Sequence, residues 1–352
     1  MSAAFGSVKS AVRTAAAQFY HASGLHQWRH RGKAVIVMYH RVLTPGEVLS
    51  QAVQPGMYVH DTVFAQHMSF LKNNFTVVSL QDLLDMWKRE VWNDRQRYCV
   101  ITFDDGWLDN YHHAYPILKK LNIPATIFLP TDYVGSREWF WPDQVAYICR
   151  ALSGRRNSER AYERFSSVLA RHGGPKVGIA SDEWTRPGEV ADRVIEWCKR
   201  LPIESVRELV AALVAELDVM LPEGRVIVNW DEVREMSAGG LSFGSHSCSH
   251  RIMTTISPDL VWEEVARSRQ VLLEQRINYV SAFCYPNGNS DPTIQDQVQT
   301  CGYEAAVGVQ MGVEGRKPQN RYALRRIGIH NDITNTIPLF CLRLFGPVTE
   351  RH

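Results

Sequence analysis

The fold is decided by residues 98–107, which read YCVITFDDGW. Residues 98–103 form a short apolar run of the kind found in a strand that is buried on both faces. Two adjacent carboxylates, Asp104 and Asp105, follow at its end, and Gly106 adds turn chemistry. In barrels of parallel strands, chemistry gathers where the strands end, so this stretch predicts both a strand and one edge of an active site.

Strand-like and helix-like segments alternate on both sides of this stretch. An apolar run at 34–39 precedes it, and a helical segment at 110–121 and a strand-like run at 125–129 follow it. Strand, helix and strand at this spacing are typical of a parallel sheet. The sequence therefore predicts an α/β fold, a distorted (β/α) barrel of about seven strands. Further strands are expected at 75–80, 241–244, 280–285, 305–307 and 326–329, and helices at 61–73, 159–171, 191–200, 203–219, 230–236, 260–275 and 291–301.

Residues 153–221 differ in character, because charged segments with helical periodicity dominate there. We interpret them as a helical insertion in a main domain that spans residues 34–340. Residues 1–33 are expected to form a separate amphipathic segment, and residues 341–352 a C-terminal tail. Two Pro-Gly pairs within residues 43–56 predict a loop there.

Composition limits the function. The chain has 352 residues, 45% of them hydrophobic, which is enough for one large core or two modest ones. A net charge of +2 is too small to favour nucleic acid as a partner. Seven cysteines without CxxC spacing indicate reduced thiols, so we predict a cytoplasmic protein, with a peripheral membrane contact as an open possibility.

The N-terminal segment carries that possibility. It lacks the long apolar core of a secretory signal, and no run of roughly 18 apolar residues predicts a transmembrane helix anywhere in the chain. Apolar residues nevertheless recur at helical spacing from Phe5 to Phe19, with Lys9 and Arg13 between them. Such a helix can lie on an anionic membrane surface or pack on the main domain, and the sequence favours neither.

A second polar cluster, residues 246–250 (HSCSH), follows the strand-like run at 241–244. One carboxylate plus two histidines is a common ligand set for a hydrolytic divalent metal, with positions left open for water and substrate. Taken alone, Asp104 and Asp105 also suit a helix N-cap, and His246 and His250 also suit a packed pair. Their shared position after strands of one barrel favours a metal site, with the second carboxylate free to act as a base.

Several motifs together resemble the polysaccharide deacetylases with a NodB-homology domain, a family of carbohydrate esterases. Residues 38–42 (MYHRV) are similar to a frequent opening of that family, and residues 102–107 (TFDDGW) to its first motif. Residues 243–250 (FGSHSCSH) are similar to the second motif, and residues 283–288 (FCYPNG) to the third. The resemblance extends from residue 34 to residue 330, and it leaves out the helical insertion and both termini.

The resemblance implies roles for these residues. Asp105, His246 and His250 would hold the metal, expected to be Zn²⁺, with Co²⁺ or Mn²⁺ as alternatives. Asp104 would act as general base on a metal-bound water that attacks the acetyl group. The oxyanion would rest on the metal and on a backbone N–H at Asn287.

Two further roles stay open at this point. The general acid has two candidates: His330, near the position of a late Leu-x-His motif of the family, and His40 in the early Tyr-His motif. Many members carry an arginine in the third motif that orients the catalytic aspartate, whereas this chain has Cys284. Arg326 or Arg41 is a candidate substitute. Substrate contacts are predicted at Tyr285, Asn287, Trp107 and Arg326.

These observations predict a metal-dependent hydrolase that removes N-acetyl groups, or less readily O-acetyl groups, from a polysaccharide, an oligosaccharide or a lipid-linked sugar. One alternative is a catalytically silent glycan-binding module of the same fold. Another is a non-haem iron oxygenase, which also uses two histidines and one carboxylate. The ligands of such an oxygenase usually lie on an antiparallel jelly roll, with the first histidine and the acid close in sequence, whereas here the acid lies far ahead of both histidines in an α/β pattern. Bound iron and dependence on 2-oxoglutarate would favour the oxygenase.

Overall fold

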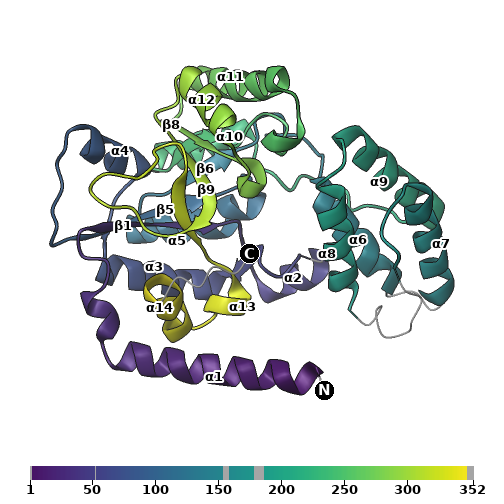
Figure 1. The fold of residues 1–352 in the computed structure, drawn as a ribbon, viewed down its shortest axis with the longest axis horizontal. Coiled ribbons are helices and arrows are strands. Elements are labelled where there is room, and N and C mark those ends of the chain that lie inside the picture. The colour runs from purple at the N-terminus through teal and green to yellow at the C-terminus, as the bar shows by residue number, and fades with distance from the viewer. Residues whose placement is uncertain (1, 52, 154–157, 178–185, 347–352) are drawn as a thin grey trace.

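The structure is a computed structural model that describes residues 2–51, 53–153, 158–177 and 186–346. Figure 1 shows a central barrel with helices around it, a group of helices at one side and a long N-terminal helix along the outside. Of the described helices, none is long and apolar enough to span a bilayer.

Seven of the described strands form a closed barrel of parallel strands. Around the barrel the order is β1, β10, β9, β8, β7, β6 and β5, and β1 pairs with β5 to close the circle. The two-residue strand β4 (Thr76–Val77) pairs with the beginning of β5. The predicted seven-stranded barrel is therefore confirmed. The other strands are β1 Lys33–Tyr39, β5 Arg97–Phe103, β6 Thr126–Leu129, β7 Ser242–Ser245, β8 Tyr279–Cys284, β9 Ala305–Met311 and β10 Leu324–Gly328.

Both faces of β1 and β5 are buried, which explains their continuous apolar sequence. In β1, Ala34 and Ile36 belong to one hydrophobic cluster together with Leu84. Val35 and Val37, which point the opposite way, belong to another cluster. The helices that accompany the strands are α3 Asp61–Asn74, α4 Leu80–Lys88, η2 Asn110–Ala114, α5 Tyr115–Leu121, α10 Trp230–Ala238, α11 Pro258–Glu274 and α12 Pro292–Thr300.

Local sequence sets where these helices begin. Ser79 and Asp82 form a capping box at the start of α4, and Asn229 and Glu232 form one at the start of α10. Ser257 caps α11, and proline occupies the first turn of that helix.

Four helices form a separate unit beside the barrel, which we call the helical unit (Figure 1). They are α6 Trp141–Ser153, α7 Ser158–Arg171, α8 Pro187–Cys198 and α9 Ile203–Leu217. Their apolar faces bury a core of their own, with Phe165 and Leu213 fully buried. Because α6 contributes to this core, the unit begins earlier in the chain than the insertion predicted from residue 153. The predicted insertion also includes residues 154–157 and 178–185, which lie outside the described residues.

Two segments differ from the prediction. The expected loop at 43–56 contains helix α2 (Pro45–Gln51), and it lies between two short parallel strands, β2 (Arg41–Leu43) and β3 (Tyr58–His60). The expected C-terminal tail begins inside helix α14 (Ile337–Phe345), whose Leu344 and Phe345 are buried in the main core. The tail assignment was therefore wrong for residues 341–345. Residues 347–352 lie outside the described part of the chain.

The N-terminal segment forms helix α1 (Ser2–Ala22) and the short helix η1 (Leu25–Trp28). Tyr20 donates a hydrogen bond to the carbonyl of Phe345 at 3.1 Å, and Arg13 donates one to the carbonyl of Ile333 at 2.9 Å. One side of α1 therefore packs on α14 and on the neighbouring helix α13 (Asn331–Thr334).

Candidate active site and metal centre

Three predicted metal ligands meet at the carboxyl end of the barrel. Asp105 Oδ1 lies 3.3 Å from His246 Nε2 and 3.1 Å from His250 Nε2. These separations suit a tetrahedral ion with bonds of about 2.0 Å, which would space its ligand atoms about 3.3 Å apart. Asp105 and His246 are buried, and His250 is partly exposed, so the centre is open on one side.

The backbone is strained at this centre. Asp105 has a φ of 72° and His250 a φ of 58°, in the left-handed region that non-glycine residues seldom adopt. Gly106 also has a positive φ, and a Cβ there would lie 2.5 Å from Leu129 Cδ2. Strain of this kind persists only where the surroundings fix it, and it clusters at functional sites.

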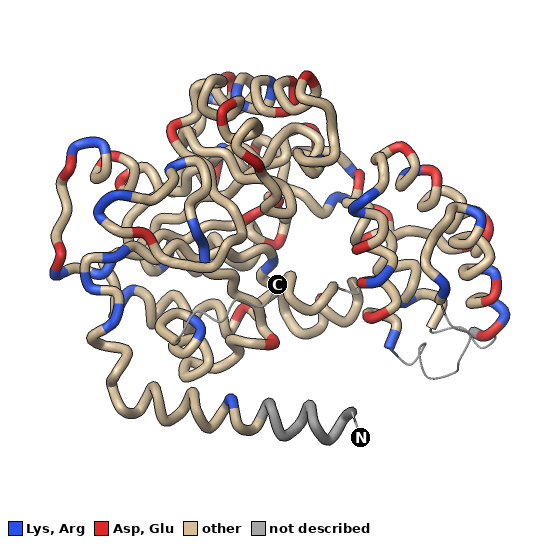
Figure 2. Tube along the Cα trace, viewed as in Figure 1, with Lys and Arg blue, Asp and Glu red and all other residues tan. Residues whose placement is uncertain are grey.

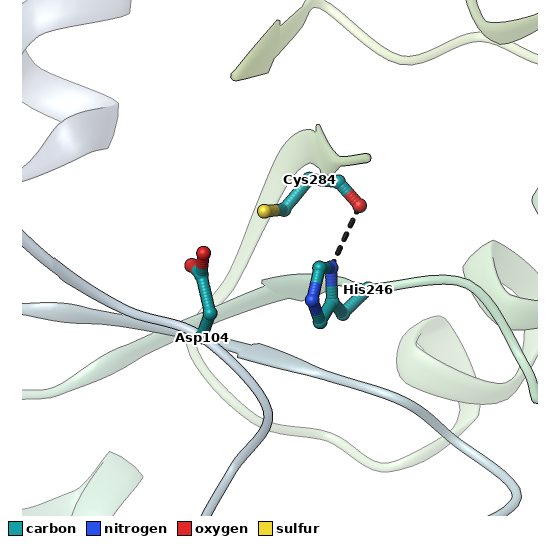
Figure 3. Close-up of side chains that lie close together, drawn as sticks. All are labelled: Asp104, His246 and Cys284. Atoms are coloured by element: carbon teal, nitrogen blue, oxygen red, sulfur yellow. Dashed lines mark hydrogen bonds between the residues drawn. The ribbon is translucent and has the colours of Figure 1, made fainter. Parts of the chain in front are cut away.

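Neighbouring groups orient two of the ligands. Trp107 Nε1 donates to Asp105 Oδ2 at 2.9 Å, which leaves Oδ1 facing the imidazoles. His246 Nδ1 lies 2.8 Å from the backbone oxygen of Cys284, so Nδ1 carries the proton and Nε2 is free to bind (Figure 3). Arg41 stacks 4.3 Å above the Trp107 ring and pairs with Asp109 at 2.8 Å. Such outer contacts fix ligand geometry.

The loop between the two histidines is held by a buried carboxylate. Glu264 of α11 accepts hydrogen bonds from the backbone N–H groups of Cys248 and Ser249, both at 2.8 Å. The Cys248 thiol donates to the backbone oxygen of Glu264 at 3.4 Å. Cys248 therefore points away from the centre, although it lies between the ligands in sequence.

Asp104 is held by an arginine from the opposite part of the chain. Arg326 of β10 makes a bidentate contact with it, with both N–O distances at 2.7 Å. Burial opposes ionisation of Asp104, but the guanidinium outweighs it, so the pKa of this carboxyl lies below its usual value. Arg326 thus takes the place left open by Cys284, and Arg41 does not, because it pairs with Asp109.

The prediction that Arg326 contacts substrate was wrong. Its side chain is fully buried, and it also donates to the backbone oxygen of Gly308 at 2.8 Å. It lies beneath Asp104 and cannot meet a glycan directly.

A second group of potential ligands, Asp104, His246 and Cys284, lies close together (Figure 3). Its position already holds a cation, because Arg326 lies 2.7 Å from Asp104 and 3.3 Å from the sulfur of Cys284. Burial also raises the pKa of the Cys284 thiol, which disfavours the thiolate that a metal would need. Asp105, His246 and His250 are therefore the better metal site.

Of the two candidates for the general acid, one adjoins this centre. His40 Nε2 lies 4.0 Å from Asp104 Oδ2, and His40 lines the cavity above the centre, which we call the central cavity. His330 directly precedes helix α13, pairs with Asp332 and is absent from the residues described around that cavity. The prediction for His330 therefore finds no support in the geometry.

The remaining predicted contacts form the wall and mouth of the central cavity. Trp107 and Tyr285 line it but are almost fully buried, and the Tyr285 hydroxyl donates to the carbonyl of Tyr322 at 3.0 Å. They support the cavity wall and offer little ring surface for stacking. Asn287 is exposed at the mouth with a φ of 57°, so its backbone is available to a ligand.

The helical unit forms the other side of the central cavity, and sequence reasoning missed most of it. The helical unit contributes Trp141, Asp143 and Ile195, and Lys199 follows α8. Burial raises the pKa of Asp143 to about 7. The cavity has a volume of about 180 Å³ and lies between the barrel and the helical unit. No local signal marks Asp143, Ile195 or Lys199, because only tertiary packing brings them to the site.

Fold and site together define a (β/α) barrel protein with a candidate Asp-His-His metal centre. The sequence profile of the family described as polysaccharide deacetylase matches residues 93–151 and 209–306. The interruption in the match falls within the helical unit. The chain belongs to this family of deacetylase hydrolases, as the sequence resemblance predicted.

Curated relatives match parts of the chain. YxkH of Bacillus subtilis is 28% identical over 113 residues, which are 32% of this chain and 37% of YxkH. A poly-β-1,6-N-acetyl-D-glucosamine N-deacetylase of Staphylococcus aureus is 42% identical over 59 residues, 17% of this chain and 18% of that enzyme. The chain thus spans well under two thirds of the length of these relatives.

Solved structures show the same fold. The Streptococcus pyogenes deacetylase PplD, solved in complex with acetate, aligns with a TM-score of 0.56 at 18% identity, over 90% of this chain and 99% of PplD. IcaB from Ammonifex degensii aligns with a TM-score of 0.54 at 17% identity, over 88% of this chain and 97% of IcaB. The parallel barrel differs from the antiparallel jelly roll on which the ligands of the oxygenase alternative usually lie.

Proposed function

We propose that the chain is a metal-dependent deacetylase that hydrolyses N-acetyl groups on a hexosamine-containing glycan. The observation that carries the proposal is the centre of Asp105, His246 and His250 beside an ionised Asp104, at the floor of an open cavity. The hexosamine is supported by the relative named as a poly-N-acetylglucosamine N-deacetylase.

The residues of the chain suit amide hydrolysis. A bound divalent metal such as Zn²⁺ would supply a Lewis acid and lower the pKa of a water. Asp104, kept ionised by Arg326, takes the proton of the attacking water, whose oxygen adds to the acetyl carbon. His40, 4.0 Å from Asp104, donates a proton to the sugar nitrogen as the C–N bond breaks. The products are acetate and a free amine.

Acetate release tests this proposal. Purified protein incubated with N-acetylglucosamine oligomers should release acetate, lose this activity to a chelator and regain it with Zn²⁺. Parallel reloading with Co²⁺ and Mn²⁺ would identify the metal that supports turnover best. A metal-loaded protein that releases no acetate from a broad panel of N- and O-acetylated glycans would instead favour the silent glycan-binding module.

We also propose that α1 and η1 rest on an anionic membrane surface, from which the enzyme would reach lipid-linked sugars. Residues 1–46 contain no Asp or Glu, and Figure 2 shows no acidic residue along the described part of α1. The outward side of this segment exposes large apolar side chains beside the exposed Arg29, Arg31 and Lys33, a pattern typical of an interfacial helix. The exposed apolar residues are Val12 at 64%, Phe19 at 73%, Leu25 at 55% and Trp28 at 70%.

Vesicle sedimentation tests the membrane contact. The protein should bind vesicles that contain phosphatidylglycerol, bind pure phosphatidylcholine weakly and dissociate at high salt. Phe19→Glu with Trp28→Glu should abolish binding, whereas Met220→Glu, an exposed apolar control at 82%, should not. Equal binding by both variants would contradict the proposal.

All seven cysteines are unpaired, which supports the cytoplasmic face as the location.

A further inference from the structure

A second cavity opens beside the central cavity, and we call it the side cavity. It has a volume of about 210 Å³ and lies between the helical unit and the loop that follows His250. The two cavities share four residues on their boundary, Trp141, Lys199, His250 and Ile252. One candidate metal ligand therefore forms part of the wall of both spaces.

The wall of the side cavity is mainly apolar. Leu201, Ile203 and Val206 come from the helical unit, and Ile256 and Leu260 come from the barrel side. The charged groups at its edge already have partners: Arg251 pairs with Glu204 at 3.4 Å, and Lys199 with Glu196 at 2.6 Å. Neither cation needs an anionic ligand, so the surface that remains for a ligand is apolar.

The side cavity lies where the helical unit meets the barrel. Polar contacts fix one unit against the other on both sides of the cleft: Arg251 with Glu204 on one side, and Gln54 with Asp192 at 2.6 Å on the other. Ligand sites in proteins are mostly lined by apolar side chains, so a cavity lined by several aliphatic side chains beside a candidate metal centre suits an apolar part of a ligand.

We propose that the side cavity binds an apolar substituent of the sugar substrate, an alkyl or prenyl chain attached to the acetylated ring. The identity of the sugar rests on the function proposed above, whereas the apolar chain rests on the cavity. Continuity through His250 and Trp141 is the reason for a single ligand. A sugar ring whose acetyl group lies at the metal centre would lie directly beside the side cavity. The volume of the side cavity, about 210 Å³, is enough for several methylene groups.

A chain-length series tests this inference. The ligands are β-N-acetylglucosaminides with methyl, butyl, hexyl and octyl aglycones, used below their micellar concentrations. Each buried methylene is expected to tighten binding about fourfold until the cavity is filled. Dissociation constants from calorimetry and KM values from acetate release should both fall with chain length.

Two variants of helix α11 provide a matched pair. Leu260→Glu places a carboxylate in the side cavity and should remove the chain-length dependence while leaving the methyl glycoside unaffected. Leu273→Glu, at a site 50% exposed on the same helix, should keep the dependence. Thermal unfolding of both variants separates loss of binding from loss of folding.

The opposing outcomes are distinct. A wild-type affinity that does not change with aglycone length, or a dependence that survives Leu260→Glu, overturns the inference. A dependence on the length of the N-acyl group instead would also overturn it, because the occupant would then be the group removed. Chain-length-dependent binding without acetate release from any glycoside would refute the proposed deacetylase and leave the side cavity assigned.

Discussion

The central cavity has two walls, one from the barrel and one from the helical unit, and they differ in what holds their side chains in place. On the barrel side, Asp104 and His246 are held by partners from distant parts of the chain, and Asp105 is held by the nearby Trp107. On the helical side, Trp141 and Ile195 stand on helices that have a core of their own. The barrel wall has the fixed polar geometry that chemistry requires, whereas the helical wall offers Trp141 and Ile195 as an apolar surface that can contact a substrate.

The largest difference between the walls should appear when one carboxylate in each is neutralised. Asp104→Asn removes the proposed base and should lower kcat about 10³-fold, within the usual range for general catalysis. Metal content, measured by elemental analysis, should stay at the wild-type level because Asp105, His246 and His250 are unchanged.

Asp143→Asn is the matched change in the helical wall. It should alter kcat by less than about tenfold, because Asp143 lines the cavity without belonging to the candidate metal centre. If both variants lost activity equally, chemistry would not be confined to the barrel wall. If Asp104→Asn kept its turnover, the proposed mechanism would fail.

Removing the support of Asp104 should be the next largest effect. Arg326→Met leaves a buried carboxylate without its cation and should lower the free energy of unfolding by about 3–5 kcal/mol. Without the guanidinium, burial raises the pKa of Asp104, so the acidic limb of the pH–rate profile should move to higher pH. Urea unfolding and a kcat profile from pH 5 to 9 measure the two effects.

Arg326→Lys separates charge from geometry in this prediction. Lysine keeps the positive charge but cannot make the bidentate contact, so it should restore part of the stability and leave kcat low. A pH profile identical to that of the wild type in both variants would show that Arg326 has a structural role only.

Acid should destabilise the barrel before the helical unit. His67 is buried in the barrel core, where Tyr39 and the backbone oxygen of Thr334 contact its two nitrogens at 3.2 and 2.8 Å. Burial lowers its pKa to about 4, below the value of about 6.5 expected in the unfolded chain. The folded state therefore binds fewer protons, and stability is lost as the pH falls from 6.5 towards 4.

The expected loss from His67 is about 2 kcal/mol at pH 5. His67→Gln should be less stable than the wild type at pH 7, and the difference should shrink by this amount at pH 5. Urea unfolding at both pH values measures it. Parallel pH dependences would contradict the assignment. No buried histidine lies in the helical unit among the residues that the structure describes, so its local unfolding should show no such slope.

The sequence predicted the barrel wall well, because its signals are local. Apolar runs mark β1 and β5 as strands buried on both faces, and the acids and histidines directly follow strands. The partner of Asp104 had no local signal, since Arg326 lies 222 positions away and only closure of the barrel joins them. The sequence offered Arg326 as one of two candidates, and the structure distinguishes it from Arg41.

The segments that the sequence predicted wrongly differ from the structure for physical reasons. Helix α2 was expected as loop because Pro45 and Gly46 suggest a turn, yet proline is favoured in the first turn of a helix. The predicted main domain ended at residue 340, inside helix α14. The reason is that Phe345 packs in the main core against residues far away in the sequence, so no local pattern shows that the helix continues. The cavity residues of the helical wall, such as Asp143 and Lys199, depend on how two units pack.

The smallest effect should come from the helical wall itself. Trp141 lines both cavities at the start of α6, and its ring offers an apolar face to a sugar or to an attached chain. Trp141→Ala should raise KM roughly three- to tenfold, the effect of one lost aromatic contact. The kcat should stay within about twofold of the wild-type value. Trp262→Ala, at an exposed site on α11, is the control and should change neither constant. A fall in kcat for Trp141→Ala with unchanged KM would mean that the helical wall takes part in the chemical step, and the division of labour between the two walls would no longer hold.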